Sequence, residues 1–163
     1  FAVISFEAVS HMLFYMVIYS FMTLGAFGVL IALQNKYSIK SIDEWNGVGY
    51  VHPMICALMV LNLLSLAGLP PTSGFVAKFY ILASIIESKT FYWLAIVAII
   101  NTVIALYYYF NIAKSMFLET DFKKKYESLD KIPVYIIFIT SIQGIIFYLY
   151  WSPLYNVIQS LFS

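Results

Sequence analysis

The hydrophobic positions of this chain form long runs that are separated by short polar stretches. Three runs are long enough to be transmembrane helices: residues 12–33, 91–117 and 133–151. A bilayer core of about 30 Å requires around 20 helical residues, so each run predicts one span. Polar residues fill 34–49 and 119–131 between them. Pro153 is expected to end the last helix and to leave a short tail at the membrane surface.

A further apolar segment, 52–87, is too long to be one straight span. As a continuous helix its 36 residues would measure about 54 Å. Two prolines lie at its centre, and prolines and glycines disfavour the helix interior, so a break is predicted near 68–73. The residues expected to make the break are Gly68, Pro70, Pro71 and Gly74. The segment is therefore either two separate spans or one discontinuous span.

The distribution of lysines favours one discontinuous span. If the segment crosses once, every lysine except Lys78 and Lys89 lies on the same side of the membrane. If it crosses twice, the lysines are divided more evenly. Cytoplasmic and matrix-side loops collect basic residues. We therefore predict an all-α membrane helix bundle, a single domain over 1–163, with four transmembrane elements and both ends of the chain outside.

Composition excludes several classes of protein. Hydrophobic residues make up 63% of the 163 residues and charged residues 10%, too few to cover a water-soluble surface. The net charge of +1 gives no basic surface for nucleic acid. One cysteine excludes a disulfide framework, and no phosphate-binding loop or haem or iron–sulfur motif is present. We therefore expect no redox chemistry in this chain.

Lys78 is the strongest candidate for a functional residue. It follows the predicted break by four residues and lies within an apolar segment. An ionisable side chain inside a membrane is costly and is by default a functional hypothesis, although the amine could instead extend to the headgroups. Weaker candidates for a proton path are Glu7 and His11, spaced i, i+4, and Tyr107 and Tyr108. An interfacial His–Glu contact and aromatic packing are the structural alternatives.

Two sequence segments resemble a known family. Two segments carry the resemblance: residues 14–29, FYMVIYSFMTLGAFGV, and residues 64–80, LSLAGLPPTSGFVAKFY. Both resemble signature segments of the antiporter-like subunits of respiratory complex I. The order Lys78-Phe79-Tyr80 most resembles the chain N type, the counterpart of mitochondrial NADH–ubiquinone oxidoreductase subunit 2. The sister chain M type typically has a glutamate at the position of Lys78.

The resemblance implies a membrane-arm subunit that translocates protons, with Lys78 as proton carrier. The family subunit has fourteen helices, so this chain would be its C-terminal portion or one half of a split subunit. Flavin, iron–sulfur clusters and quinone would belong to other subunits. The implied partners are other membrane-arm subunits, the upstream half of the same subunit and lipids, but no nucleic acid. Two alternatives stay open: a subunit of a multisubunit cation/proton antiporter, and a structural half-subunit with no proton path.

Residue usage bears on location. All nine basic residues are lysines, and Phe and Tyr number 14 each, a bias typical of AT-rich organelle genomes. The prediction is the mitochondrial inner membrane, with a bacterial plasma membrane as the alternative.

Overall fold

The computed structural model describes residues 6–39, 41–87, 89, 91–118 and 127–160, and within these ranges the regular structure is entirely helical. The long helices are α1 (Phe6–Tyr37), α3 (Pro53–Ala67), α4 (Ser73–Glu87), α5 (Tyr92–Leu118) and α6 (Lys131–Leu149). The short helices are η1 (Ile42–Trp45), α2 (Val48–Val51) and α7 (Trp151–Ser160).

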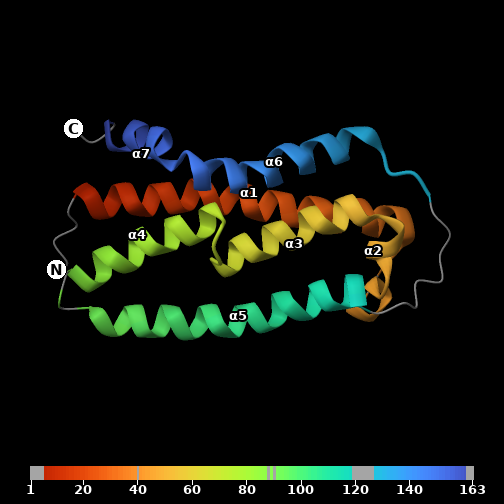
Figure 1. Cartoon of the computed structure of the whole chain (residues 1–163), viewed down its shortest axis with the longest axis horizontal. Coiled ribbons are helices and arrows are strands. Elements are labelled where there is room, and N and C mark those ends of the chain that lie inside the picture. Colours follow the sequence, from red (N-terminus) through yellow and green to blue (C-terminus); the bar gives the residue numbers. More distant parts are fainter. Residues whose placement is uncertain (1–5, 40, 88, 90, 119–126, 161–163) are drawn as a thin grey trace.

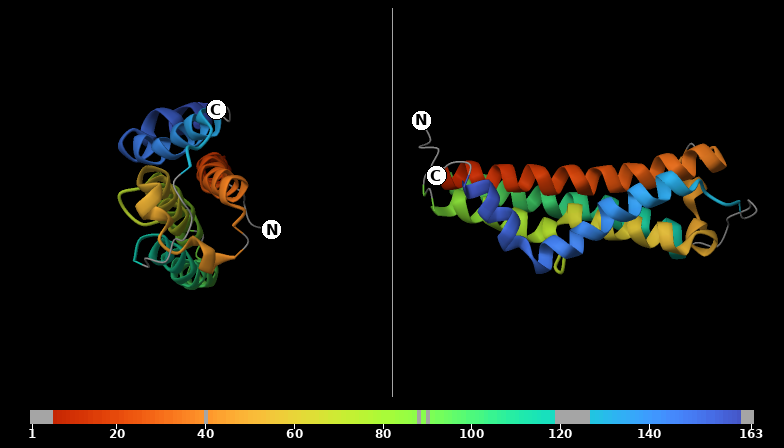
Figure 2. Two further views of the ribbon diagram at one scale, coloured as in Figure 1. Left: turned by 90° about the vertical axis from the view of Figure 1, so that its right-hand side faces the viewer. Right: turned by 90° about the horizontal axis from the view of Figure 1, so that it is seen from above.

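The long helices run side by side along the bundle (Figure 1). Helix α1 has 32 residues, about 48 Å at 1.5 Å per residue. Helices α3 and α4 have 15 residues each and lie one after the other along the bundle, offset sideways where they meet, and both contact α1 and α5. In the end-on view of Figure 2, α6 and α5 lie on opposite sides of the bundle.

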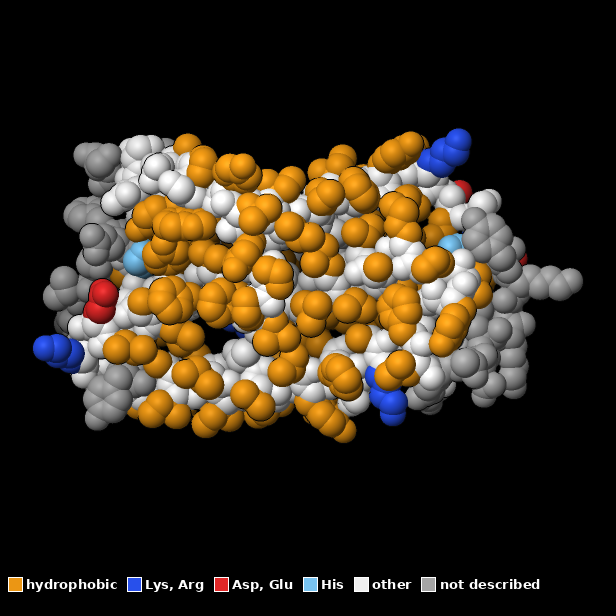
Figure 3. Space-filling view, viewed as in Figure 1, with side chains coloured by type: hydrophobic (Ala, Val, Ile, Leu, Met, Phe, Trp, Pro, Cys, Tyr) orange, Lys and Arg blue, Asp and Glu red, His pale blue; other side chains and the backbone are white. Residues whose placement is uncertain are grey.

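Three of the predicted spans correspond to helices long and apolar enough to cross a membrane: 8–37, 93–118 and 131–149. Helix α3 is apolar but shorter. The orange side chains that cover the middle of Figure 3, with charged side chains mainly toward its ends, are typical of a surface that faces lipid. The all-helical membrane fold is therefore confirmed at this level.

The prediction that Pro153 ends the last helix is wrong. Helix α6 already ends at Leu149, and Pro153 is the third residue of α7. Proline is tolerated in the first turn of a helix, because the N–H groups there have no intrahelical acceptor. Helix α7 packs its apolar side, including the buried Ile158, against α1 and α4.

Two clusters of buried side chains hold the bundle together. One joins α1, α3, α5 and α6 and includes Val29, Leu33 and Ile137. The other joins α1, α4 and α7 around Phe14 and Ile18. Asn62 of α3 adds a polar contact, since its Nδ2 donates to Ser141 Oγ of α6 at 2.6 Å.

Candidate functional site around Lys78

Helix α3 ends at Ala67 and helix α4 begins at Ser73, on either side of the residues where the break is predicted. Gly68 ends α3 in a left-handed conformation with φ 75°, and its N–H donates to carbonyls of the last turn. Pro70 and Pro71 follow, where the missing N–H groups prevent the helix from continuing. Thr72 then closes the turn, with its Oγ1 donating to Leu69 O at 2.7 Å.

Gly74 allows the start of α4 to lie directly against the end of α3. A Cβ atom at Gly74 would be 1.9 Å from the carbonyl oxygen of Ser65, a distance that no side chain can occupy. The N–H of Gly74 donates to Ser65 Oγ at 3.2 Å. The glycine therefore brings the two helix ends together and fixes where the first turns of α4 lie.

The amine of Lys78 lies at the end of α3. Its Nζ donates to the carbonyl oxygens of Leu66 at 2.9 Å and Ala67 at 3.3 Å, and it lies 3.4 Å from Thr102 Oγ1 of α5. The last carbonyls of a helix lack intrahelical donors and carry its partial negative charge. The C-terminal end of α3 thus supplies acceptors for the amine of Lys78.

Gly68 also shapes the position of Lys78. A Cβ atom at Gly68 would lie 2.8 Å from Lys78 Cδ, closer than normal van der Waals contact. The side chain of Lys78 therefore passes directly over this glycine on its way to the carbonyls. Only a residue without a side chain allows both the left-handed turn and this passage.

Lys78 lines a cavity of about 390 Å³ between α1, α4 and α5. The hollow between α4 and α5 is visible in Figure 3, with a basic side chain inside it. Its polar lining residues are Tyr15, Tyr19, Lys78, Asn101, Thr102 and Tyr109. Lys78 is only partly buried within this chain. A cavity with several hydroxyl and amide groups is suited to hold water beside an amine.

The weaker candidates lie at different places in the bundle. Tyr107 and Tyr108 are 66% and 61% exposed on α5, and the cavity is lined instead by Tyr109. Glu7 lies in the first turn of α1, and its side chain is outside the described part of the structure. His11 is 1 turn further along α1.

His11 joins three helices near one end of the bundle. Its Nδ1 is 2.6 Å from Ser84 Oγ of α4, and its Nε2 is 3.0 Å from the Tyr155 hydroxyl of α7. Its ring also stacks on Tyr80 and Tyr155 at centroid distances of 5.0 and 5.5 Å. Sequence reasoning missed these contacts because their partners lie 73 and 144 residues away.

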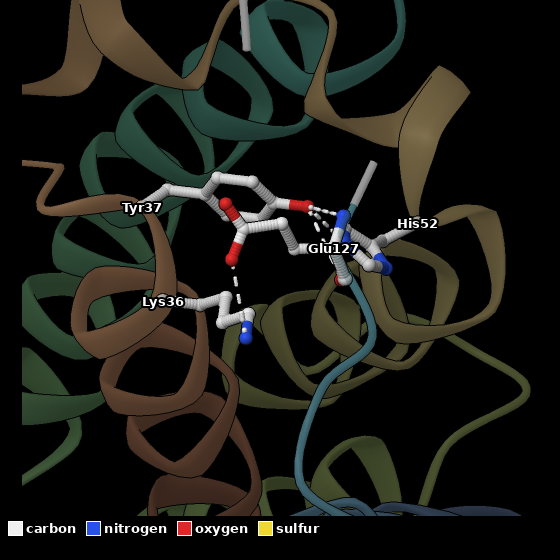
Figure 4. A network of polar contacts seen from close by, with 4 residues as sticks. All are labelled: Lys36, Tyr37, His52 and Glu127. Atoms are coloured by element: carbon white, nitrogen blue, oxygen red, sulfur yellow. Dashed lines mark hydrogen bonds and ion pairs between the residues drawn. The ribbon is translucent and has the colours of Figure 1, made fainter. Parts of the chain in front are cut away.

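A second polar network lies at the opposite end of the bundle (Figure 4). The hydroxyl of Tyr37 is 2.6 Å from His52 Nε2 and accepts a hydrogen bond from the N–H of Glu127 at 3.0 Å. The ammonium of Lys36 is 3.2 Å from Glu127 Oε2. These contacts attach the chain before α6 to the ends of α1 and α3.

These features define a helical membrane protein with a lysine that lines a cavity close to where α3 ends and α4 begins. A sequence profile of the NADH:quinone oxidoreductase/Mrp antiporter transmembrane family matches residues 1–105. The chain belongs to this family.

Curated relatives carry the names of subunit N. The chain is 38% identical over 113 residues to NADH-quinone oxidoreductase subunit N 2 of Rhizobium meliloti, covering 69% of this chain and 23% of the relative. It is 40% identical over 118 residues to subunit N of Moorella thermoacetica, covering 71% of this chain and 25% of the relative. It is 31% identical over 161 residues to subunit N 2 of Sorangium cellulosum, covering 97% of this chain and 32% of the relative.

The chain spans about a quarter of the length of relatives such as the first two. The relatives are bacterial and of the subunit N type, which agrees with the resemblance to chain N but does not single out the mitochondrial subunit 2 type. The mitochondrial location therefore stays a prediction from residue usage.

Proposed function

We propose that this chain is the C-terminal part of a membrane subunit of an NADH:quinone oxidoreductase and contributes to proton translocation through Lys78. The observation that carries the proposal is the contact of Lys78 Nζ with the free carbonyls of Leu66 and Ala67 inside a polar cavity. The names of the relatives support membership of this complex, and the polar cavity beside the amine supports a role in proton transfer. Quinone, flavin and iron–sulfur chemistry would belong to other subunits, because this sequence has no motif for them.

In this proposal, α3 and α4 form one discontinuous transmembrane element. Each measures about 22 Å, less than the bilayer core, whereas the two together match the length of α1 beside them. Non-helical backbone at membrane depth is tolerated where it lines a cavity or is enclosed by protein. The four elements then place Lys36, Lys114 and Lys131 at one end of the bundle and Lys89 at the other.

The mechanism requires a charge that can be held and released. An ammonium at Lys78 is stabilised by the negative end of α3 and by the Thr102 hydroxyl. A change of charge in a neighbouring part of the assembly alters this balance, and water in the cavity receives or returns the proton. Moving one charge across 100 mV requires about 2.3 kcal/mol. A change of two pKa units, at about 1.36 kcal/mol each, would supply it.

The test compares two lysine variants in membrane vesicles that contain the intact complex. Lys78→Met removes the amine and keeps a long apolar side chain, whereas Lys89→Met removes a lysine beyond the end of α4. We expect Lys78→Met to lower the number of protons pumped per NADH oxidised, and Lys89→Met to leave it unchanged. An unchanged ratio in Lys78→Met, with normal assembly, would reject Lys78 as a carrier and favour a structural role.

The family description also covers Mrp antiporters, so a cation/proton antiporter subunit is the second candidate. The observation that favours the first candidate is that the relatives compared above are all named as NADH-quinone oxidoreductase subunits. Copurification with flavin and iron–sulfur subunits, and with a polypeptide carrying the remaining helices, is expected. Sodium-dependent antiport without these subunits would select the second candidate.

A further inference from the structure

A second cavity, of about 300 Å³, opens between α1 and α6 at the end of the bundle where α1 terminates. We call it the α1/α6 groove. Its inner part is lined by Gly28, Ile31, Ala32, Ile136 and Ile137, and its mouth by Asn35, Lys36, Leu129, Asp130 and Pro133. From Gly28 to Lys36 the groove follows α1 for about 12 Å, from the interior of the apolar span to its charged end.

The floor of the groove is closed by direct helix contact. A Cβ atom at Gly28 would be 2.9 Å from Ile137 Cγ1, so α1 and α6 already touch there. Ile137 is 1% exposed, whereas Ile31 and Ile136 on the walls are 53% and 56% exposed. The groove is therefore a shallow apolar channel whose walls face away from the bundle core.

The mouth is lined by one basic side chain, Lys36, and one acidic side chain, Asp130, and a second acidic side chain, Glu127, is paired with Lys36. The Lys36 side chain is 34% exposed, and its ammonium has three donors, of which the ion pair with Glu127 engages one (Figure 4). Asp130 precedes α6 but makes no side-chain capping bond, and its carboxylate has no hydrogen bond or ion pair with any other residue that the structure describes. A cation and an anion at the membrane end of an apolar groove match a zwitterionic headgroup above an acyl chain.

The remainder of the longer subunit is expected to cover a different face. The cavity with Lys78 exposes hydroxyl and amide groups of α1 and α5 within the spans, and such groups require protein or water as neighbours. The inner part of the α1/α6 groove offers only apolar side chains. Lipid is a suitable neighbour for this groove and an unsuitable one for the other cavity.

We propose that the α1/α6 groove binds one phosphatidylethanolamine molecule. An acyl chain would lie along Ile31, Ala32 and Ile136, the phosphate would accept hydrogen bonds from Lys36, and the primary ammonium would donate to Asp130. Pockets that select anionic lipids contain an excess of basic residues. Here Lys36 is accompanied by the carboxylates of Asp130 and Glu127, so basic residues are not in excess, which disfavours an anionic lipid and favours one without net charge. An ethanolamine donates hydrogen bonds to a carboxylate, whereas a choline has no N–H to donate.

The first experiment uses the unmodified membrane complex, so that it does not depend on any variant folding. The complex is stripped of lipid in mild detergent and then incubated with equal amounts of phosphatidylethanolamine and phosphatidylcholine that carry identical acyl chains. Native mass spectrometry counts the lipids retained. We expect one phosphatidylethanolamine to be bound per copy of this chain, with a ~10-fold preference over phosphatidylcholine. A preference of this size corresponds to about one charge-assisted hydrogen bond. Equal retention of both lipids would overturn the headgroup assignment.

The second experiment locates the retained lipid. Ala32→Phe fills the groove with a ring, and the matched control Ile99→Phe adds the same ring on α5, where Ile99 is 52% exposed. We expect Ala32→Phe to remove the bound lipid and Ile99→Phe to retain it. Asp130→Asn should keep the lipid but abolish the preference for ethanolamine. Full retention in Ala32→Phe, or a helix of another polypeptide found in the groove, would overturn the proposal.

Discussion

Replacing Gly68 by alanine tests whether the end of α3 positions Lys78. Gly68 has φ 75°, a conformation that costs an L-residue about 1–2 kcal/mol. The new methyl group would also lie 2.8 Å from Lys78 Cδ, about 0.6 Å inside the 3.4 Å at which ordinary contact begins. A displacement of that size lengthens the 2.9 Å bond from Nζ to Leu66 O toward the limit of hydrogen bonding.

The matched control is Gly47→Ala, because Gly47 has a similar φ of 77° beside α2, far from Lys78 in the bundle. Both variants carry the same type of backbone strain and should lower the amount of assembled complex, whereas only Gly68→Ala adds a close contact with Lys78. Only Gly68→Ala should also lower the protons pumped per NADH oxidised in the complex that does assemble. If the two variants pump with the same ratio, the contact between Gly68 and Lys78 has no part in translocation.

Three further substitutions test other parts of the account. Thr102→Val, which keeps the shape but removes the acceptor 3.4 Å from the amine, should lower the pumping ratio, and Thr102→Ser should restore it; equal ratios would contradict a positioning role. Gly74→Ala should cost about 3 kcal/mol and reduce assembly on native gels, because its Cβ would meet Ser65 O at 1.9 Å. A double-mutant cycle of Asn62→Ala and Ser141→Ala should show a coupling of about 0.6–1.7 kcal/mol in denaturation of the complex; additive effects would argue against their 2.6 Å hydrogen bond.

The long helices, and the helix ends on either side of the two prolines, could be predicted from the sequence because both are local properties. A run of about 20 apolar residues predicts a span wherever it packs. Likewise, Pro70 and Pro71 lack the N–H groups that the interior of a helix requires, whereas a proline in a first turn, such as Pro153, is tolerated. The structure accordingly ends α3 at Ala67 and begins α4 at Ser73.

The contacts of the functional candidates could not be predicted because they depend on how distant segments pack. Lys78 was singled out by its apolar surroundings, but its acceptors, the Leu66 carbonyl and the Thr102 hydroxyl, follow from the turn and from the placement of α5. His11 was paired with Glu7 by helical spacing alone. The structure gives its ring nitrogens partners on α4 and α7, which no local pattern indicates, and the pairing with Glu7 stays a prediction because the Glu7 side chain lies outside the described part of the structure.

The central claim is that the amine of Lys78 gains and loses a proton during turnover, and infrared difference spectroscopy tests it most directly. The complex would be labelled with ¹⁵N-lysine, and ammonium bands would be recorded as NADH is oxidised, in the unmodified complex, in Lys78→Met and in Lys89→Met. The account predicts an isotope-sensitive ammonium band that is absent only from Lys78→Met. An identical band in all three, or no lysine band in the unmodified complex, would contradict it.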